Sequence, residues 1–126
     1  MNWTATGALL MALAVAIGAF GAHGLKGRLD AYSMSVYEKA VFYHFVHALG
    51  ILFIALLART GIINATTQNR GAGLLLIGIV LFSGSLYALA ISGVRVLGAV
   101  TPFGGLAFIA GWLYLAYGAV RGGRAS

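Results

Sequence analysis

Four long apolar stretches alternate with short polar segments along the chain. They run approximately over residues 3–22, 39–58, 71–92 and 102–120. Each has about 20 residues, and a helix of that length covers about 30 Å, the thickness of the hydrocarbon core of a bilayer. Because the connectors are short, consecutive helices should run antiparallel. The pattern therefore predicts an all-α integral membrane protein with four transmembrane helices in an antiparallel up-down bundle, as one domain over residues 1–126.

The composition agrees with a bilayer as the solvent. Hydrophobic residues make up 61% of the chain and charged residues 8%, and the mean hydropathy is +0.97. This leaves little room for a domain outside the membrane, so any function should lie within or between the helices. The chain contains no cysteine, which excludes disulfides and thiolate-bound metal centres.

Basic residues lie near the ends of the predicted helices and give a net charge of +6. They are Lys26, Arg28, Lys39, Arg59, Arg70, Arg95, Arg121 and Arg124. Such residues usually meet lipid headgroups, whereas a nucleic-acid surface gathers its cations on one face. We therefore expect the lipid bilayer as a partner and no nucleic acid. The basic residues divide equally between the two membrane faces, and the free α-amino group then favours cytoplasmic termini in the inner (plasma) membrane.

The most polar segment, residues 23–38, lies between the first two apolar stretches. Its polar side chains alternate with Leu25, Leu29, Met34 and Val36. The segment is too polar to cross a bilayer but is amphipathic. This pattern predicts an interfacial segment that lies along the headgroup layer.

Small residues recur at helical spacing in the first stretch. They form two ridges, Ala8, Ala12 and Ala16, and Ala14, Gly18 and Ala22. Residues four apart share a helix face, and small ones let a second helix approach closely. The pattern predicts a central position for the first helix. Spare small-residue surface on the first and third helices also suggests an accessory or scaffold role in a homo-oligomer or a larger membrane complex.

Polar side chains concentrate in one half of the predicted bundle, where two connectors meet the same membrane face. The candidate site residues there are His23, Tyr43, His44, His47, Ser83, Ser85, Tyr87, Arg95 and Thr101. If the second helix enters the membrane at Lys39, His47 lies about 12 Å deep. An ionisable group at such a depth usually faces a partner or a wet cavity. We therefore expect a polar pocket, open toward residues 23–38, that binds or passes a small polar solute, ion or proton.

A structural role for His47 is the main alternative. A neutral imidazole can hydrogen-bond Ser83, Ser85 or a backbone carbonyl and so hold two helices in register. A proton relay through His47, His44 and Tyr43 is a further alternative, since it needs no complete ligand set.

A metal site is less well supported. His44 and His47 are three residues apart and could share an ion, but only His23 and Glu38 are available to complete the ligand set. We therefore expect no metal and no other cofactor. Glu38 and Arg95 fall at the same bilayer edge and are expected either to form an ion pair or to extend separately toward the headgroups.

Catalytic motifs are missing from the sequence. Asp30 and Glu38 are the only carboxylate side chains, and the glycine-rich runs lack the strand and lysine context of a phosphate-binding loop. With so few groups available to act as acid, base or nucleophile, the sequence favours a protein that is not an enzyme.

Three ordered motifs resemble one known family. They are Gly18-Ala-Phe-Gly-Ala-His-Gly-Leu-Lys, Tyr43-His-Phe-Val-His-Ala-Leu, and Phe82-Ser-Gly-Ser-Leu-Tyr followed by Leu97-Gly-Ala-Val-Thr-Pro-Phe-Gly-Gly. Together they resemble the domain of unknown function 423 family of small four-helix bacterial membrane proteins. The resemblance implies a multi-pass inner-membrane protein and brings no established activity. The family usually has Gln where this chain has His44, which weakens the metal interpretation but keeps a hydrogen-bonding side chain.

Overall fold

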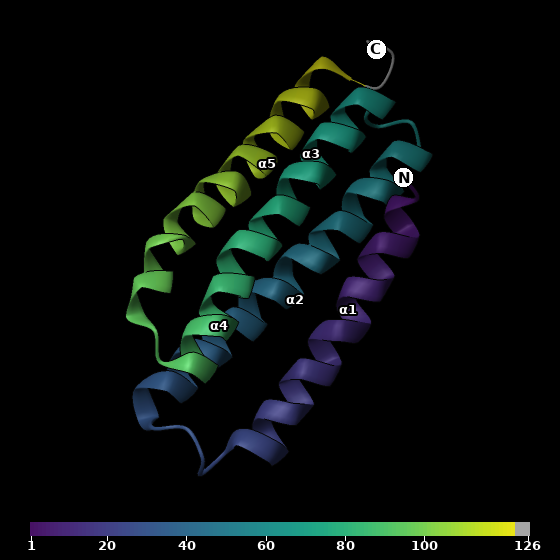
Figure 1. Ribbon diagram of the computed structural model, residues 1–126. Helices are drawn as coiled ribbons and strands as arrows, with labels where there is room; N and C mark the ends of the chain where they lie inside the picture. The colour runs from purple at the N-terminus through teal and green to yellow at the C-terminus, as the bar shows by residue number, and fades with distance from the viewer. Residues whose placement is uncertain (123–126) are drawn as a thin grey trace.

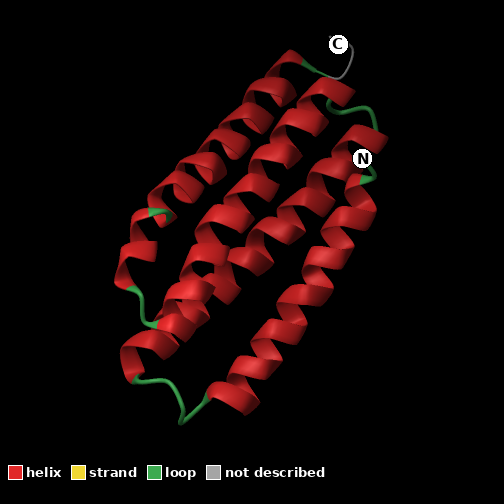
Figure 2. Cartoon of the chain, in the orientation of Figure 1, coloured by secondary structure: helices red, strands yellow, loops and turns green. Residues whose placement is uncertain are grey.

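The computed structural model describes residues 1–122, and each of its regular elements is a helix (Figures 1 and 2). The order is α1 (Trp3–Phe20), η1 (Gly21–Leu25), α2 (Ala31–Arg59), α3 (Ala65–Gly78), η2 (Ile79–Ser83), α4 (Gly84–Ser92), η3 (Arg95–Ala99) and α5 (Thr101–Arg121). η1 and η2 are π-helical turns, and η3 is a 3-10 helix. These elements form four continuous helices long and apolar enough to cross a membrane. The predicted four-helix membrane fold is confirmed; Arg124 lies outside the described residues.

The four spans lie side by side and run antiparallel in chain order (Figure 1). α1 packs on α2, α2 packs on α3 and α4, and α5 packs on α3 and η2. Within an 18-residue window, 44% of the residues are buried in each of the two middle spans, against 17% in the first and the last. The prediction of a central first helix is therefore wrong, because α1 and α5 lie at opposite edges of the bundle.

Only one of the two small-residue sides of α1 contacts another helix. On that side Gly7 lies against Leu52, Gly18 lies against Val41, and Ala14 is fully buried. The other ridge is exposed and consists of Ala8, Ala12 and Ala16. One ridge is enough to seat α1 on α2, and this explains why the second ridge does not place α1 at the centre.

The polar segment 23–38 is divided between two helices. η1 extends the first span to Leu25, and α2 begins at Ala31, where the Asp30 carboxylate accepts a hydrogen bond of 2.7 Å from the Ser33 amide. α2 has 29 residues and is about 43 Å long, more than the hydrocarbon core requires. The prediction of one separate interfacial segment is therefore wrong: the Asp30 cap starts α2 early, and its first turns form part of the long helix.

α3 also begins earlier than predicted. The Asn64 side chain accepts a 2.8 Å hydrogen bond from the Thr67 amide and starts a helix at Ala65, within the expected connector. At the same membrane face, Trp3 Nε1 donates a 2.9 Å hydrogen bond to Asn69 Oδ1. This bond ties the beginning of α1 to α3 across 66 positions of sequence.

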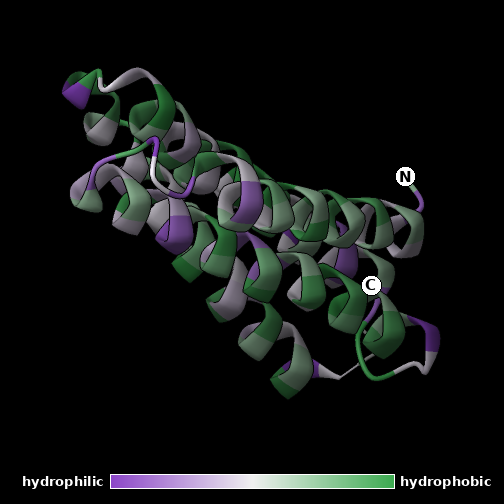
Figure 3. Cartoon of the chain, turned by 90° about the horizontal axis from the view of Figure 1, so that it is seen from below, coloured by the Kyte–Doolittle hydropathy of each residue, from purple (hydrophilic) through white to green (hydrophobic). Residues whose placement is uncertain are grey.

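Glycines bring α5 close to the third span. A Cβ at Gly78 would collide with Phe108, and a Cβ at Gly104 would collide with the backbone of Phe82. A Cβ at Gly111 would likewise lie 2.7 Å from Leu75. Gly71, Ala72 and Gly78 of the third span are buried, so these small residues are used within this bundle. On its outer surface hydrophobic residues predominate over the helices (Figure 3), as a bilayer requires.

Candidate functional site

Two hydrogen bonds join α2 to the third span. Ser83 Oγ donates to the Ala40 carbonyl at 2.8 Å, and Ser83 is completely buried. His44 Nδ1 lies 2.8 Å from the Tyr87 hydroxyl. The antiparallel path thus brings His44, Ser83 and Tyr87 to neighbouring turns of the two helices, whereas His47 bonds to neither Ser83 nor Ser85 among the described residues. In this arrangement their polar groups hold two helices in register.

One atom of this polar layer has no partner. His44 is 1% exposed, and its Nε2 is enclosed and makes no hydrogen bond within residues 1–122. If the Tyr87 hydroxyl donates to Nδ1, the neutral ring carries its proton on Nε2. That nitrogen makes no hydrogen bond of good geometry in the described chain, although the Leu10 backbone of α1 lies close enough to interact with the His44 ring.

Ser85 and Thr101 form a separate polar contact between α4 and the beginning of α5. Their hydroxyl oxygens are 2.6 Å apart, and Ser85 Oγ also donates to the Phe82 carbonyl at 2.9 Å. A serine hydroxyl has one proton, so Thr101 is the donor in the shared bond. Neither side chain of this pair faces His47.

His47 has a different environment. Its Nδ1 lies 2.8 Å from the Tyr43 carbonyl. Because a carbonyl oxygen only accepts, Nδ1 carries the proton and the neutral ring keeps its lone pair on Nε2. The imidazole lies flat on Phe108, with ring centroids 3.5 Å apart and planes 11° apart, and it also contacts Trp112 at 5.8 Å.

A lateral groove of about 300 Å³ adjoins this ring between α2, η2 and α5. We call it the His47 groove; its lining residues are Tyr43, His47, Phe82, Gly105, Phe108, Ile109 and Trp112. None of them belongs to residues 23–38, so the expected opening toward that segment is wrong. The reason is that Gly104 lies directly against the backbone of Phe82, so that α5 and η2 are in contact there. The groove begins beyond this contact, along the later turns of α5.

His23, Arg95 and Glu38 lie apart from the groove. His23 is exposed in η1, and the Arg95 guanidinium lies 4.6 Å from the centre of the Tyr32 ring. Among the described residues Arg95 lines a pocket with Asp30, whereas Glu38 lines another near Gly18. Of the two expected arrangements, the Glu38–Arg95 ion pair is not formed, because Arg95 lies beside Tyr32 and Asp30 at the start of α2.

Asp30 is the carboxylate most affected by its surroundings. The Ser33 backbone amide, which donates to it, lowers the pKa of Asp30, and the Ser33 side chain and the nearby Arg95 charge act in the same direction. This cap stabilises the beginning of α2 at the membrane surface.

The two adjacent histidines of α2 do not converge on one point. His44 Nδ1 faces Tyr87 on α4, whereas His47 Nδ1 faces the carbonyl of Tyr43 in its own helix. Within residues 1–122, no three His, Asp or Glu side chains are grouped so that they could hold a metal ion.

Sequence reasoning missed the aromatic part of the site. Phe82, Phe108 and Trp112 line the groove, although none of the three was among the predicted site residues. The useful signal was spacing: Gly105, Phe108 and Trp112 recur at intervals of three and four and so share a face of α5. Tyr37 was also missed; its hydroxyl donates to the Ile17 carbonyl at 2.6 Å and joins α2 to α1.

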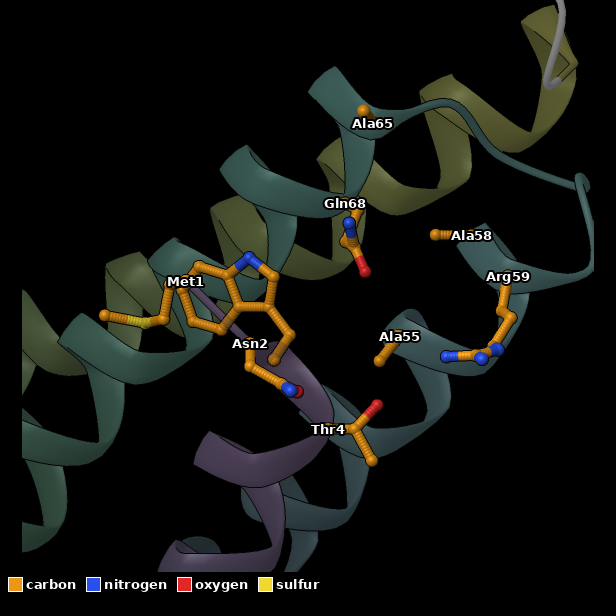
Figure 4. A pocket seen from close by; sticks show the side chains of 9 residues that line it. Met1, Asn2, Thr4, Ala55, Ala58, Arg59, Ala65 and Gln68 are labelled. Atoms are coloured by element: carbon orange, nitrogen blue, oxygen red, sulfur yellow. The ribbon is translucent and has the colours of Figure 1, made fainter.

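A second hollow lies at the membrane face that holds the chain termini. It has a volume of about 400 Å³, and Figure 4 shows the side chains of Thr4, Arg59 and Gln68 around it, from α1, α2 and α3. Ala55 and Ala58 form an apolar wall. This hollow is more polar than the His47 groove and lies at the level of the helix ends.

Comparison with known proteins identifies the family. The model of a family described as "Protein of unknown function (DUF423)" matches residues 17–105. A UPF0382 membrane protein of Staphylococcus haemolyticus is 53% identical over 109 residues, which cover 86% of this chain and 87% of the relative. A UPF0382 membrane protein of Bacillus subtilis is 46% identical over 117 residues, covering 91% and 93%. No solved structure matches the chain. The chain therefore belongs to the DUF423 family, a family of membrane proteins of unknown function.

Proposed function

We propose that this membrane protein binds a small polar solute in the His47 groove. The observation that carries the proposal is the free lone pair of His47 Nε2 beside a cavity of about 300 Å³. Ser83, Ser85 and Tyr87 are occupied by bonds to other parts of the bundle. Of the two buried histidines, His44 is enclosed, whereas His47 lines the cavity and remains suited to a ligand.

The lining defines the chemistry of the solute. A hydrogen-bond donor such as a hydroxyl or N–H would meet Nε2, and the rings of Phe82, Phe108 and Trp112 would cover a flat or apolar body. The volume is at the small end of ligand pockets in general. Because the groove opens between helices, the solute would enter from the bilayer.

Binding is favoured over catalysis by the same lining. His47 and Tyr43 are the groove's titratable side chains, and no carboxylate, lysine or serine lines it. A reaction would need a second acid, base or nucleophile in contact with the solute. We therefore propose that the protein is not an enzyme.

Fluorescence provides a direct binding test, since the chain has two tryptophans and one lines the groove. In a Trp3→Phe background, Trp112 is the remaining reporter. 4-Bromophenol is a flat quencher with one hydroxyl donor, and it should quench the Trp112 fluorescence in a saturable way. Bromobenzene lacks the hydroxyl and should bind at least about fivefold more weakly, because the missing hydrogen bond is worth about 1 kcal/mol. Equal, non-saturating quenching by both probes would refute the proposal.

Two histidine variants make the test specific. His47→Phe preserves an aromatic ring on Phe108 but removes the Nε2 acceptor, so the preference for 4-bromophenol should disappear. His23→Phe is the matched control, because His23 is exposed in η1 and does not line the groove. Loss of the preference in both variants would show that the groove is not its source.

A scaffold role is the second candidate, and the exposed side of α1 favours it. α1 packs mainly on α2 and reaches α3 through its first residue, Trp3. Its outer side carries Ala5, Ala8, Ala12, Ala16 and Ala19. Small residues at this spacing allow close helix contact within a bilayer. Such a side could meet a second copy or another subunit.

Cysteine crosslinking tests this role, because the native chain has no cysteine. Ala12→Cys in native membranes should give a crosslinked dimer or a defined heteromer with a short bismaleimide. Leu113→Cys, on the exposed side of α5, is the control and should remain uncrosslinked. Equal, weak crosslinking at both positions would argue against a specific α1 interface.

We also propose an inner-membrane location with both termini in the cytoplasm. The matching relatives are membrane proteins of bacteria. The eight basic side chains divide equally between the two faces, so the free α-amino group is what favours the terminal face as the cytoplasmic one. A C-terminal green fluorescent protein fusion should fluoresce and an alkaline phosphatase fusion should be inactive. The reverse pattern would place the termini outside.

A further inference from the structure

We infer that the terminal face carries a phosphate-binding site formed by Arg70 of α3 and Arg121 of α5. Both guanidinium groups line one hollow of about 400 Å³, together with Tyr114 and Tyr117. We call it the two-arginine hollow. It is separate from the His47 groove, and neither site depends on the other.

Each arginine is held by a tyrosine. Arg70 Nη1 donates to the Tyr114 hydroxyl at 2.9 Å, and Arg121 Nη1 donates to the Tyr117 hydroxyl at 2.9 Å. The guanidinium carbons also lie 5.9 and 5.5 Å from the centres of the same rings. The two cations are therefore oriented before any ligand arrives, which reduces the entropy cost of binding.

The packing of the two helices brings these arginines to one hollow. Gly118 of α5 lies so close to Thr67 of α3 that a Cβ would collide with the threonine side chain. This contact places the beginning of α3 beside the end of α5. Arg70 lies about one turn inside α3, and Arg121 is the last residue of α5.

The unused hydrogen-bond donors indicate the ligand. A guanidinium has five N–H donors, and each arginine uses one nitrogen for its tyrosine. Each tyrosine hydroxyl accepts from arginine and so retains its own proton to donate. The hollow also includes Thr66 and no carboxylate. Two forked cations with neighbouring hydroxyl donors fit the oxygens of a phosphate group.

Position in the bilayer favours the phosphate of an anionic lipid. Tyr114 and Tyr117 lie in the last two turns of α5, where amphipathic rings meet the headgroup layer. Free phosphate has the same oxygen chemistry, so the experiment must separate these two sources.

The hollow shown in Figure 4 supplies an internal control. It lies on the same face and has a similar volume, but Arg59 is its single arginine and makes no hydrogen bond to a tyrosine in the described chain. Arg59→Gln therefore removes one charge from this face without changing the two-arginine hollow.

Native mass spectrometry of the purified full chain in detergent tests the inference. Phosphatidylglycerol should bind the parent more tightly than phosphatidylcholine. Arg70→Gln or Arg121→Gln should weaken phosphatidylglycerol binding by about tenfold, as expected for lost charged hydrogen bonds, and Arg59→Gln should weaken it less than about twofold. Tyr114→Phe/Tyr117→Phe preserves every charge and should weaken binding by about threefold, since each lost hydrogen bond is weak.

The outcomes separate the explanations. Equal losses in the Arg59 and Arg70 variants would overturn the inference and show that only the general charge of the face matters. Inorganic phosphate that displaces the lipid at millimolar concentration would support the site and assign it to soluble phosphate. If an arginine variant fails to fold, as judged by circular dichroism, phosphatidylglycerol binding by the double tyrosine variant tests the inference instead. Unchanged binding by that variant would also overturn the inference.

Discussion

Replacement of Gly104 by Ala should force α5 away from η2. A Cβ at this position would collide with the backbone nitrogen of Phe82 and lie 2.7 Å from its Cα and Cβ. A flexible side chain could move aside, but a helical backbone cannot do so without shifting its neighbours. The neighbouring glycine is an ideal control: a Cβ at Gly105 would lie 3.9 Å from the Phe82 ring, an ordinary contact distance.

The expected free-energy changes follow from this contrast. Alanine is favoured over glycine within a helix by about 1 kcal/mol, and this gain applies to both variants. Overpacking costs about 1–3 kcal/mol, and a clash with backbone belongs at the upper end. Gly105→Ala should therefore raise the free energy of unfolding by up to about 1 kcal/mol, and Gly104→Ala should lower it by about 1–2 kcal/mol.

Unfolding in mixed micelles by added sodium dodecyl sulfate, followed by circular dichroism, measures this difference. The two variants should differ by about 2–3 kcal/mol, with Gly104→Ala the less stable. Equal stabilities would refute the close packing of α5 on η2, and with it the wall of the His47 groove that Phe82 provides.

Two further predictions concern the first half of the bundle. Tyr37→Phe removes the hydrogen bond to the Ile17 carbonyl, which also accepts from an amide of its own helix. The free energy of unfolding should therefore fall by about 0.6 kcal/mol, the average for such bonds in membranes. A fall of more than about 2 kcal/mol would show that the packing of the ring is also lost. The Ser33 amide lowers the pKa of Asp30 in the folded state below its unfolded value of 3.8. The cap therefore stabilises the helix fully above pH 3.8, and this stabilisation is lost as the pH falls through the lower folded pKa. Amide-exchange protection at the start of α2 should fall below about pH 4 in the parent but not in Asp30→Asn, and an identical pH dependence in both proteins would contradict the cap.

Hydropathy was sufficient to predict the four helices, but not where they begin. Both early starts depend on capping side chains, Asp30 before α2 and Asn64 before α3. These residues are polar, so a hydropathy pattern assigns them and the first turns to connectors. The signal was the residue type at the cap, since Asp and Asn both favour the N-cap position of a helix, and it was present in the sequence at both places.

The candidate site was only partly predictable because side-chain directions depend on η2. A π-helical turn accommodates an extra residue and changes the face on which later residues lie. Ser83 lies within this turn and faces the Ala40 carbonyl, and Ser85, which follows the turn, faces Thr101. His47 lies on α2 and faces aromatic rings of α5. The sequence placed these groups in the same half of the bundle correctly. It could not show that they pair separately.

The most direct test of the His47 groove is nitrogen NMR of the protein labelled at its three histidines. The account predicts that 4-bromophenol shifts the Nε2 resonance of His47, because the phenol donates a hydrogen bond to that lone pair. The resonances of exposed His23 and enclosed His44 should stay unchanged, and bromobenzene should leave all three unchanged. A His47 resonance that does not respond to 4-bromophenol, or responds equally to bromobenzene, would contradict the proposed site.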